Sequence, residues 1–441
     1  MSQLSFSRSR GTGLLLAAMA VLLMLSPLYG RNGTEEFTVN GLKVILKRNP
    51  ANQIIAANLY VRGGVYNLTA ETAGIEPLLF TVATKGTKKY PKEVINAELA
   101  RMGTEISGNA TRDYSAGTLR CIKPHFDKSW DIFADVLLNP TLDPNEVELA
   151  REQILTDIRQ RKDNPDSYLR LIGDEMFFKG HPYALDPAGT EESVSKLTIA
   201  QMRQYLKDNL VTSKLLLVVV GDVDKADLQK KVAAAFGKLP KGNYKPQFPA
   251  MVKHAGAEIQ THQQTLPTNY IIGYFAAPSI RDADYYPMSM AMSVLRDRVW
   301  EEVRTKRNLS YAPSAFFQNL FANCANLYVT AVQPDTTIKV MLAEVKRLQS
   351  EPISDKELRD KINVFLTGYY LQNETNAAQA AFLARYELAG LGWQQSEKFV
   401  DNMKKVTPEQ VRQVAQKYIN NIQFVVIGDP AKIDQKSFTS R

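Results

Sequence analysis

The sequence predicts an α+β fold in which two homologous halves, each a mixed α/β domain, follow one another along 441 residues. Three observations carry this prediction. Proline-marked segments recur at a fixed spacing, capped helix–strand segments recur at nearly the same spacing, and strand candidates interleave with helices in both halves. Halves of this size are each long enough to bury a core of their own.

Prolines mark the first repeat, in which a strand, a proline, a helix, a second proline and another helix follow in order. Pro124 pairs with Pro334 and Pro140 pairs with Pro352, at offsets of 210 and 212 residues. Two pairs of prolines at nearly the same spacing favour duplication over a chance likeness between generic segments.

Helix caps mark the second repeat. Thr198 with Gln201, and Thr407 with Gln410, have the capping-box spacing, in which the hydroxyl and the amide each serve an unpaired backbone N–H. The two threonines are 209 residues apart. Similar helix-start signals occur at Ser354 with Glu357 and at Asp143 with Pro144.

Apolar or alternating runs predict strands over residues 42–46, 54–61, 215–220, 270–275 and 424–427. Residues 239–249 are rich in turn formers and polar side chains, which is typical of a linker. We therefore expect a first domain over 33–238, a linker over 239–249 and a second domain over 250–435.

The first thirty residues have the pattern of a secretory signal. Arg8 and Arg10 precede an apolar run, Leu14–Leu25, that ends at Ser26 and Pro27. Twelve helical residues reach only about 18 Å, short of a bilayer core of about 30 Å. We expect residues 1–30 to be a signal peptide and the remainder to be exported to the periplasm or cell envelope. An uncleaved membrane anchor and a mitochondrial presequence are the alternatives.

Composition excludes several classes of protein. The 54 lysines and arginines are scattered among 46 acids without a long basic block, which argues against nucleic-acid binding. Two cysteines, Cys121 and Cys324, are too few for a disulfide framework or a cysteine zinc site, and leave a single bridge open.

Short motifs along the chain resemble those of the pitrilysin/insulinase-type zinc peptidases, the inverzincins. The matching motifs are Glu71–Gly74 leading to Lys85–Thr87, Asn139–Pro140, Gly180–Tyr183, Gly189–Thr190, Gly221–Asp222 and Arg304 through Tyr311. The resemblance covers nearly the whole exported chain. It implies a duplicated half-clamshell whose domains are each a largely antiparallel sheet packed by helices.

The family's chemistry needs H-x-x-E-H on a helix, where two histidines bind zinc and the glutamate activates water. Alignment on Gly74 and Lys85–Thr87 without a gap places Pro77 and Thr81 at the two histidines and Phe80 at the glutamate. The downstream ligand position falls best on Asp157. The resemblance therefore implies that this chain holds neither zinc nor a catalytic residue.

Nothing elsewhere in the sequence rebuilds such a centre. None of the four histidines stands in a zinc-peptidase motif: His125, His181, His254 and His262. His181 is expected to be structural, and Glu76, beside the lost motif, is expected to be a solvated helix-end charge. No serine or cysteine peptidase signature is present either.

The second half retains what resembles the family's arginine–tyrosine element, Arg304 and Tyr311, seven residues apart. In the family these side chains reach the active site of the opposite half and grip the peptide, a role that suits a guanidinium fork and a phenol. One departure is that the family's glycine-rich stretch is missing, because Leu295 runs directly into Arg296–Val299.

The resemblance thus implies a non-catalytic, substrate-binding subunit of a heteromeric zinc metallopeptidase. Its partner would be a homologous chain that carries H-x-x-E-H and the zinc, as a heterodimer or a dimer of dimers, with a peptide as substrate. The alternative is a non-enzymatic role, either as a homodimeric peptide-binding or scaffold protein or as a core-type subunit of a membrane assembly. Contact with a membrane is expected only through an uncleaved N-terminal segment.

Overall fold

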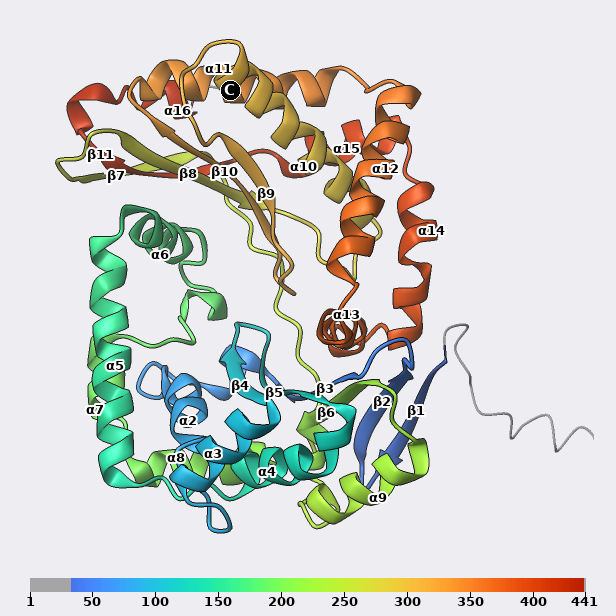
Figure 1. Cartoon of the computed structure of the whole chain (residues 1–441). Helices are drawn as coiled ribbons and strands as arrows, with labels where there is room; N and C mark the ends of the chain where they lie inside the picture. Colours follow the sequence, from blue (N-terminus) through green and yellow to red (C-terminus); the bar gives the residue numbers. More distant parts are fainter. Residues whose placement is uncertain (1–32, 440–441) are drawn as a thin grey trace, which may run out of the picture.

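The computed structural model describes residues 33–439, so the expected signal peptide over 1–30 lies outside the described residues. The strands form two sheets, one in each half (Figure 1). The first sheet contains β1 (Thr34–Val39), β2 (Leu42–Arg48), β3 (Ile54–Arg62), β4 (Glu105–Ala110), β5 (Tyr114–Ile122) and β6 (Leu215–Gly221). The second contains β7 (Glu258–Gln263), β8 (Asn269–Ala276), β9 (Ser314–Phe317), β10 (Cys324–Ala331) and β11 (Gln423–Gly428).

Helices pack around both sheets. The first half has α2 (Ile75–Ala83), α3 (Lys92–Met102), α4 (Phe126–Leu138), α5 (Pro144–Asp163), α6 (Pro165–Phe177), α7 (Glu191–Lys196), α8 (Ile199–Asn209) and α9 (Lys225–Phe236). The second half has α10 (Tyr285–Val299), α11 (Pro334–Ser350), α12 (Asp355–Gln372), α13 (Asn376–Leu388), α14 (Phe399–Lys404), α15 (Pro408–Tyr418) and α16 (Lys436–Thr439). No helix among residues 33–439 is long and apolar enough to cross a membrane.

The two sheets share one topology over five strands, and the first sheet has β1 as an additional edge strand. The strand order is β1-β2-β6-β3-β5-β4 in the first sheet and β7-β11-β8-β10-β9 in the second. Neighbouring strands are antiparallel except for one parallel pair in each sheet, β2 with β6 and β7 with β11. The helices repeat as well, since α12 and α13 each begin 211 residues after α5 and α6. The predicted duplicated α+β fold is confirmed.

The elements that local signals marked are present in the structure. Each of the five strands read from the sequence is present, with ends within two residues of the expected bounds. Thr198 and Thr407 form complete capping boxes. Ser354 accepts the Glu357 backbone N–H, but no return bond from the Glu357 side chain is present at this helix start. Both cysteines are free and buried, so the possible bridge does not form.

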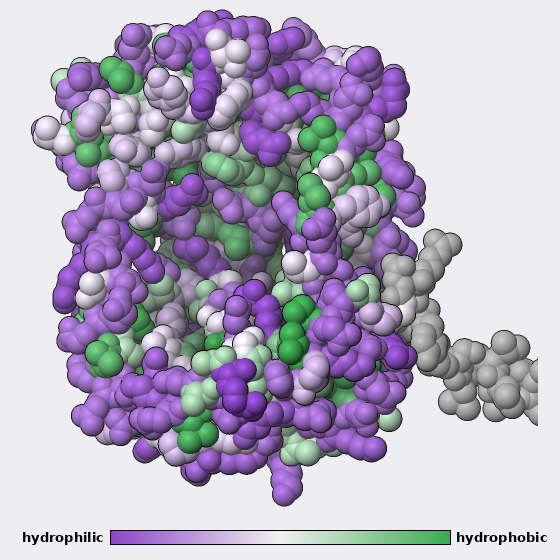
Figure 2. Space-filling model, in the orientation of Figure 1, coloured by the Kyte–Doolittle hydropathy of each residue, from purple (hydrophilic) through white to green (hydrophobic). Residues whose placement is uncertain are grey.

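The two halves exchange a helix. Helix α6 of the first half covers the second sheet, and α13 of the second half covers the first sheet (Figure 1). The apolar contacts under α6 join Leu169, Ile172 and Phe177 to Ile272, Tyr274 and Val425. Those under α13 join Leu383, Ala384 and Trp393 to Tyr60, Leu216 and Val218. Each half therefore completes the core of the other, which differs from the expectation of two self-contained cores. Figure 2 shows the surface hollowed between the halves.

Candidate functional site

Helix α2 carries the positions of the lost metal motif. It begins after Gly74, whose φ of 91° and contact with Val194 leave no room for a Cβ. Its buried face, which includes Leu78 and Val82, packs against Val147 and other residues of α5. The two helices that supply zinc ligands in the family are therefore neighbours here as well.

The side chains at the motif positions offer no metal donors. Pro77 and Phe80 are half-buried, and Thr81 is exposed and donates its hydroxyl to the Pro77 carbonyl at 2.8 Å. The Phe80 ring lies against β4, where a Cβ added at Gly108 would overlap it. The aromatic ring thus fills space beside the sheet where the family has a glutamate, and zinc does not fit this set of side chains.

Asp157 projects from α5 into solvent and accepts a hydrogen bond from the Gln153 amide at 2.9 Å. Within residues 33–439, no three His, Cys, Asp or Glu side chains gather closely enough to hold a metal ion. His181 has contacts that hold a loop in place, because its Nδ1 accepts the Tyr183 N–H at 3.1 Å and its Nε2 lies 3.1 Å from the Ala250 carbonyl.

Glu76 is not the solvated charge expected from the sequence. It is 1% exposed, and its carboxylate accepts a hydrogen bond from the Tyr205 hydroxyl. Burial raises the pKa of Glu76 to about 6, although hydrogen bonds from Tyr205 and Ser115 and the charge of Lys214 oppose that rise. The expectation was wrong because the covering residue, Tyr205, comes from α8, far along the chain.

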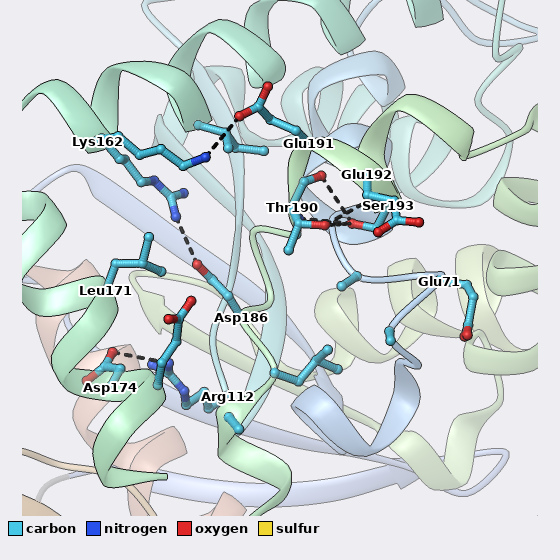
Figure 3. A pocket seen from close by; sticks show the side chains of 18 of the residues that line it. Glu71, Arg112, Lys162, Leu171, Asp174, Asp186, Thr190, Glu191, Glu192 and Ser193 are labelled. Atoms are coloured by element: carbon cyan, nitrogen blue, oxygen red, sulfur yellow. Dashed lines mark hydrogen bonds and ion pairs between the residues drawn. The ribbon is translucent and has the colours of Figure 1, made fainter. Parts of the chain in front are cut away.

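A cavity of about 720 Å³ lies in the first half between α5, α6, the start of α7 and the loop before α2 (Figure 3). None of the four motif positions lines it. Its walls are charged, but most of the basic side chains are held in ion pairs: Arg112 with Asp174, Arg161 with Asp186, Lys162 with Glu191, and Lys196 with Glu192. Most of the positive charge in this cavity is therefore neutralised by neighbouring acids, and the cavity is separate from the lost metal motif.

In the second half, α10 continues into a single π-helical turn, Trp300–Thr305. Val299 and Val303 are fully buried and fix this turn against the core. The turn closes where the Leu309 N–H bonds the Val303 carbonyl at 2.9 Å, with Asn308 at a φ of 50°. Asparagine tolerates this left-handed conformation better than most residues. Because the family's glycine-rich stretch is missing here, α10 and the π-helical turn form one continuous helix up to Arg304.

Arg304 lies between two aromatic rings. Its guanidinium carbon is 4.4 Å from the centre of the Trp300 ring and 5.5 Å from that of Tyr311. One of its nitrogens, Nη1, donates to the Tyr311 carbonyl at 2.7 Å. Trp300 is 43% exposed and Tyr311 is 76% exposed. We call Trp300, Arg304 and Tyr311 the arginine platform.

The structure thus brings together the two second-half residues singled out in the sequence and adds Trp300 to them. The sequence held a usable signal for Trp300, because a residue four before Arg304 on a helix lies over the same face. By contrast, Pro77, Phe80, Thr81 and Asp157 lie on adjacent helices without forming a site.

The fold and the motif positions define a duplicated zinc-peptidase fold whose metal motif has been lost. A model of the insulinase family (peptidase family M16) matches residues 43–190, and a model described as the peptidase M16 inactive domain matches residues 196–365. The chain belongs to the peptidase M16 family and is a member without the H-x-x-E-H motif.

Relatives of known name differ in their described activity. The chain is 26% identical to the mitochondrial-processing peptidase subunit beta of Blastocladiella emersonii, over 58% of this chain and 55% of that protein. It is 22% identical to the non-peptidase homolog YmxG of Helicobacter pylori, over 90% of this chain and 94% of that one. A crystal structure of a peptidase M16 inactive domain from Pseudomonas fluorescens superposes with a TM-score of 0.83 at 20% identity, covering 91% of this chain and 99% of that one.

Proposed function

We propose that this chain is the non-catalytic, peptide-binding subunit of a heteromeric zinc metallopeptidase in the cell envelope. The observation that carries the proposal is a contrast within one chain: the metal motif is replaced by Pro77, Phe80 and Thr81, while Arg304 and Tyr311 stay together at the surface. A chain that had lost all contact with substrate would have no need to keep this exposed pair.

In the proposed assembly, the homologous partner supplies zinc and the general base, and the arginine platform reaches its active site. The guanidinium offers planar donors to carbonyl or carboxylate oxygens of the peptide, and the Tyr311 phenol can donate to developing negative charge. Closure of two half-clamshells around a peptide would also exclude water and orient the scissile bond. The Blastocladiella relative is named as a subunit of a peptidase, which supports a partner of this kind.

The test is cleavage by a purified complex of this chain with an exported H-x-x-E-H homologue from the same genome. Arg304→Ala or Tyr311→Phe should leave the complex assembled and its zinc bound, yet slow turnover about 100- to 1000-fold, the usual loss when one preorganised donor is removed. Arg304→Lys should rescue little, because it keeps the charge but loses the planar fork.

Arg307→Ala is the matched control. Arg307 is one turn further along, is exposed and is paired with Glu302, so its removal leaves the arginine platform intact. Wild-type rates for all the variants in an intact complex would refute the proposal. That result would favour a scaffold role without peptidase activity, and the Helicobacter relative is likewise named a non-peptidase homolog.

A further inference from the structure

Arg304 differs from the other cations around it. Five basic residues occur between residues 296 and 307, and four of them have a carboxylate within 4 Å: Arg296 with Asp297, Arg298 with Glu357, and Lys306 and Arg307 with Glu302. Among the residues that the structure describes, Arg304 has no such partner. Asp297, Glu357 and Glu302 are thus engaged by other cations, and within residues 33–439 the Arg304 guanidinium has no carboxylate within 4 Å.

The surroundings of Arg304 hold its guanidinium in one orientation. Trp300 and Tyr311 flank it, and the Nη1–H···O bond to the Tyr311 carbonyl fixes its rotation. Aromatic contacts stabilise the cation without using any of its N–H donors. Four of the five N–H groups of an arginine remain after the bond to Tyr311, and two of them can meet both oxygens of a carboxylate.

We propose that the arginine platform is a carboxylate-binding site for a peptide, with Arg304 as the residue that binds and Trp300 as the residue that positions it. The carboxylate is either the C-terminus of the peptide or an aspartate or glutamate side chain. This inference rests on the proposed function, since it names the group of the peptide that the second half recognises. It adds a selectivity that a grip on backbone carbonyls alone would not have.

The isolated full chain carries its own reporter for this site. Of the three tryptophans, Trp130 and Trp393 are 4% and 0% exposed, whereas Trp300 is open to solvent and touches Arg304. We would titrate the chain with three versions of an acetylated octapeptide of alternating serine and alanine: one with a free C-terminus, one with a C-terminal amide, and one with the amide and a central glutamate.

The expected result is a saturable change in Trp300 emission with at least one of the carboxylate peptides and none with the neutral amide. A response to the free C-terminus alone assigns the site to chain ends, and a response to the glutamate peptide alone assigns it to acidic side chains. Equal binding of all three peptides, or binding of none at millimolar concentration, would overturn the inference.

Variants separate binding from positioning, with affinities measured by calorimetry because some variants lack the reporter. Arg304→Ala should weaken binding at least about tenfold, as expected when a charged hydrogen-bond partner is lost. Trp300→Ala should weaken it several-fold, and Trp300→Phe should restore most of the loss, because phenylalanine keeps a ring over the cation. Arg307→Ala should bind as the unmodified chain does. Unchanged binding by Trp300→Ala would remove Trp300 from the site.

The carboxylate site and the proposed function can be refuted independently of each other. Carboxylate binding by the isolated chain, without any effect of Arg304 on cleavage in a complex, would refute the peptidase role and leave the binding site standing. Arg304-dependent cleavage together with equal binding of the neutral and acidic peptides would leave the proposed function standing and refute the carboxylate site.

Discussion

The two halves have the same fold but differ in the helix that, in the first half, carries the positions of the metal motif. Pro77 on α2 and Pro287 on α10 are 210 residues apart, at matching places in the duplicated fold. In the first half this helix is partly open and has apolar or hydroxyl side chains where the family binds zinc. In the second half it is buried along most of its length and delivers Arg304 to the surface at its end. A duplicated fold can thus lose its metal ligands in one copy while the other copy keeps Arg304 and Tyr311, the residues that we propose bind peptide.

The largest effect is expected from restoring the lost metal motif in the first half. The combined variant Pro77→His, Phe80→Glu, Thr81→His and Asp157→Glu recreates the family's ligand set on α2 and α5. We expect it to hold one zinc per chain with a Kd below about 1 µM, equivalent to more than about 8 kcal/mol. The unmodified chain should hold no stoichiometric zinc after purification without chelators. Elemental analysis and calorimetry would measure both.

The triple variant that keeps Phe80 is the control for this experiment, because it has the ligands without the general base. It should bind zinc as well, and neither variant should do so if α2 and α5 are placed differently from those of active relatives. A folded four-residue variant without zinc would therefore contradict the correspondence between these positions and the family's motif.

The next largest effect concerns the exchanged helices. Trp393→Ala removes a fully buried side chain from the core beneath α13, and Phe177→Ala does the same beneath α6. Each should lower the free energy of unfolding by about 3–5 kcal/mol. Because each half completes the core of the other, both variants should still unfold in a single transition, followed in denaturant by circular dichroism.

Leu149→Ala on the exposed side of α5 is the control, and it should change stability by less than about 0.5 kcal/mol. Two separate transitions, each affected by only one of the core substitutions, would mean that the halves fold independently despite the exchange.

How far the sequence could predict this structure depends on how local each signal is. The strand Leu215–Gly221 is buried at every residue, and its unbroken apolar run predicted it from the sequence. The edge strand Glu105–Ala110 is mostly exposed and has no alternating pattern, so nothing in the sequence marked it. No local pattern states which sheet α6 or α13 will cover.

The candidate site shows the same division. Arg304 and Tyr311 could be found because their spacing resembles a family motif, and Trp300 could have been added from helical periodicity. The burial of Glu76 could not be read, because it depends on Tyr205 in α8, 129 residues along the chain. Contacts between distant segments are what composition and periodicity leave out.

Glu76 gives a prediction of intermediate size. Its pKa of about 6 in the folded state exceeds the ordinary value of 4.5, so the proton binds the folded chain more tightly. The carboxyl therefore favours folding below about pH 4.5 relative to neutral pH, and this advantage is lost as the pH rises through about 6. Glu76→Gln should stabilise the protein by up to about 2 kcal/mol at pH 8.

The gain should shrink between pH 6 and pH 4.5 and vanish below that range, as followed by denaturant unfolding at several pH values. Glu152→Gln on the exposed face of α5 is the control and should show no comparable gain. A destabilising effect of Glu76→Gln at pH 8 would mean that the bond from Tyr205 to the charged carboxylate outweighs the cost of burial.

The smallest effects test whether the two halves keep the same helix starts. The Thr198 hydroxyl accepts the Gln201 N–H at 3.2 Å, and the Thr407 hydroxyl accepts the Gln410 N–H at 3.3 Å. In both cases the side-chain oxygen of the glutamine accepts a hydrogen bond from the backbone N–H of the threonine, at 2.8 and 3.0 Å. Thr198→Ala and Thr407→Ala should therefore each cost about 1 kcal/mol, and threonine to glycine only a few tenths.

Ser354 provides the contrast, because its helix start has only half of this arrangement. Its hydroxyl accepts the Glu357 N–H at 3.1 Å, while the Glu357 carboxylate lies 3.6 Å from Arg298 instead of returning to the cap. Ser354→Ala should cost about as much as the threonine-to-alanine changes, because the hydroxyl makes the same bond. Glu357→Ala should leave the cap at Ser354 intact. Gln201→Ala and Gln410→Ala should each weaken the cap of their helix by a few tenths of a kcal/mol. Urea unfolding of the six alanine variants and the two glycine variants would measure these differences. Unequal costs for Thr198→Ala and Thr407→Ala would show that the halves have diverged even in the elements that still mark their common origin.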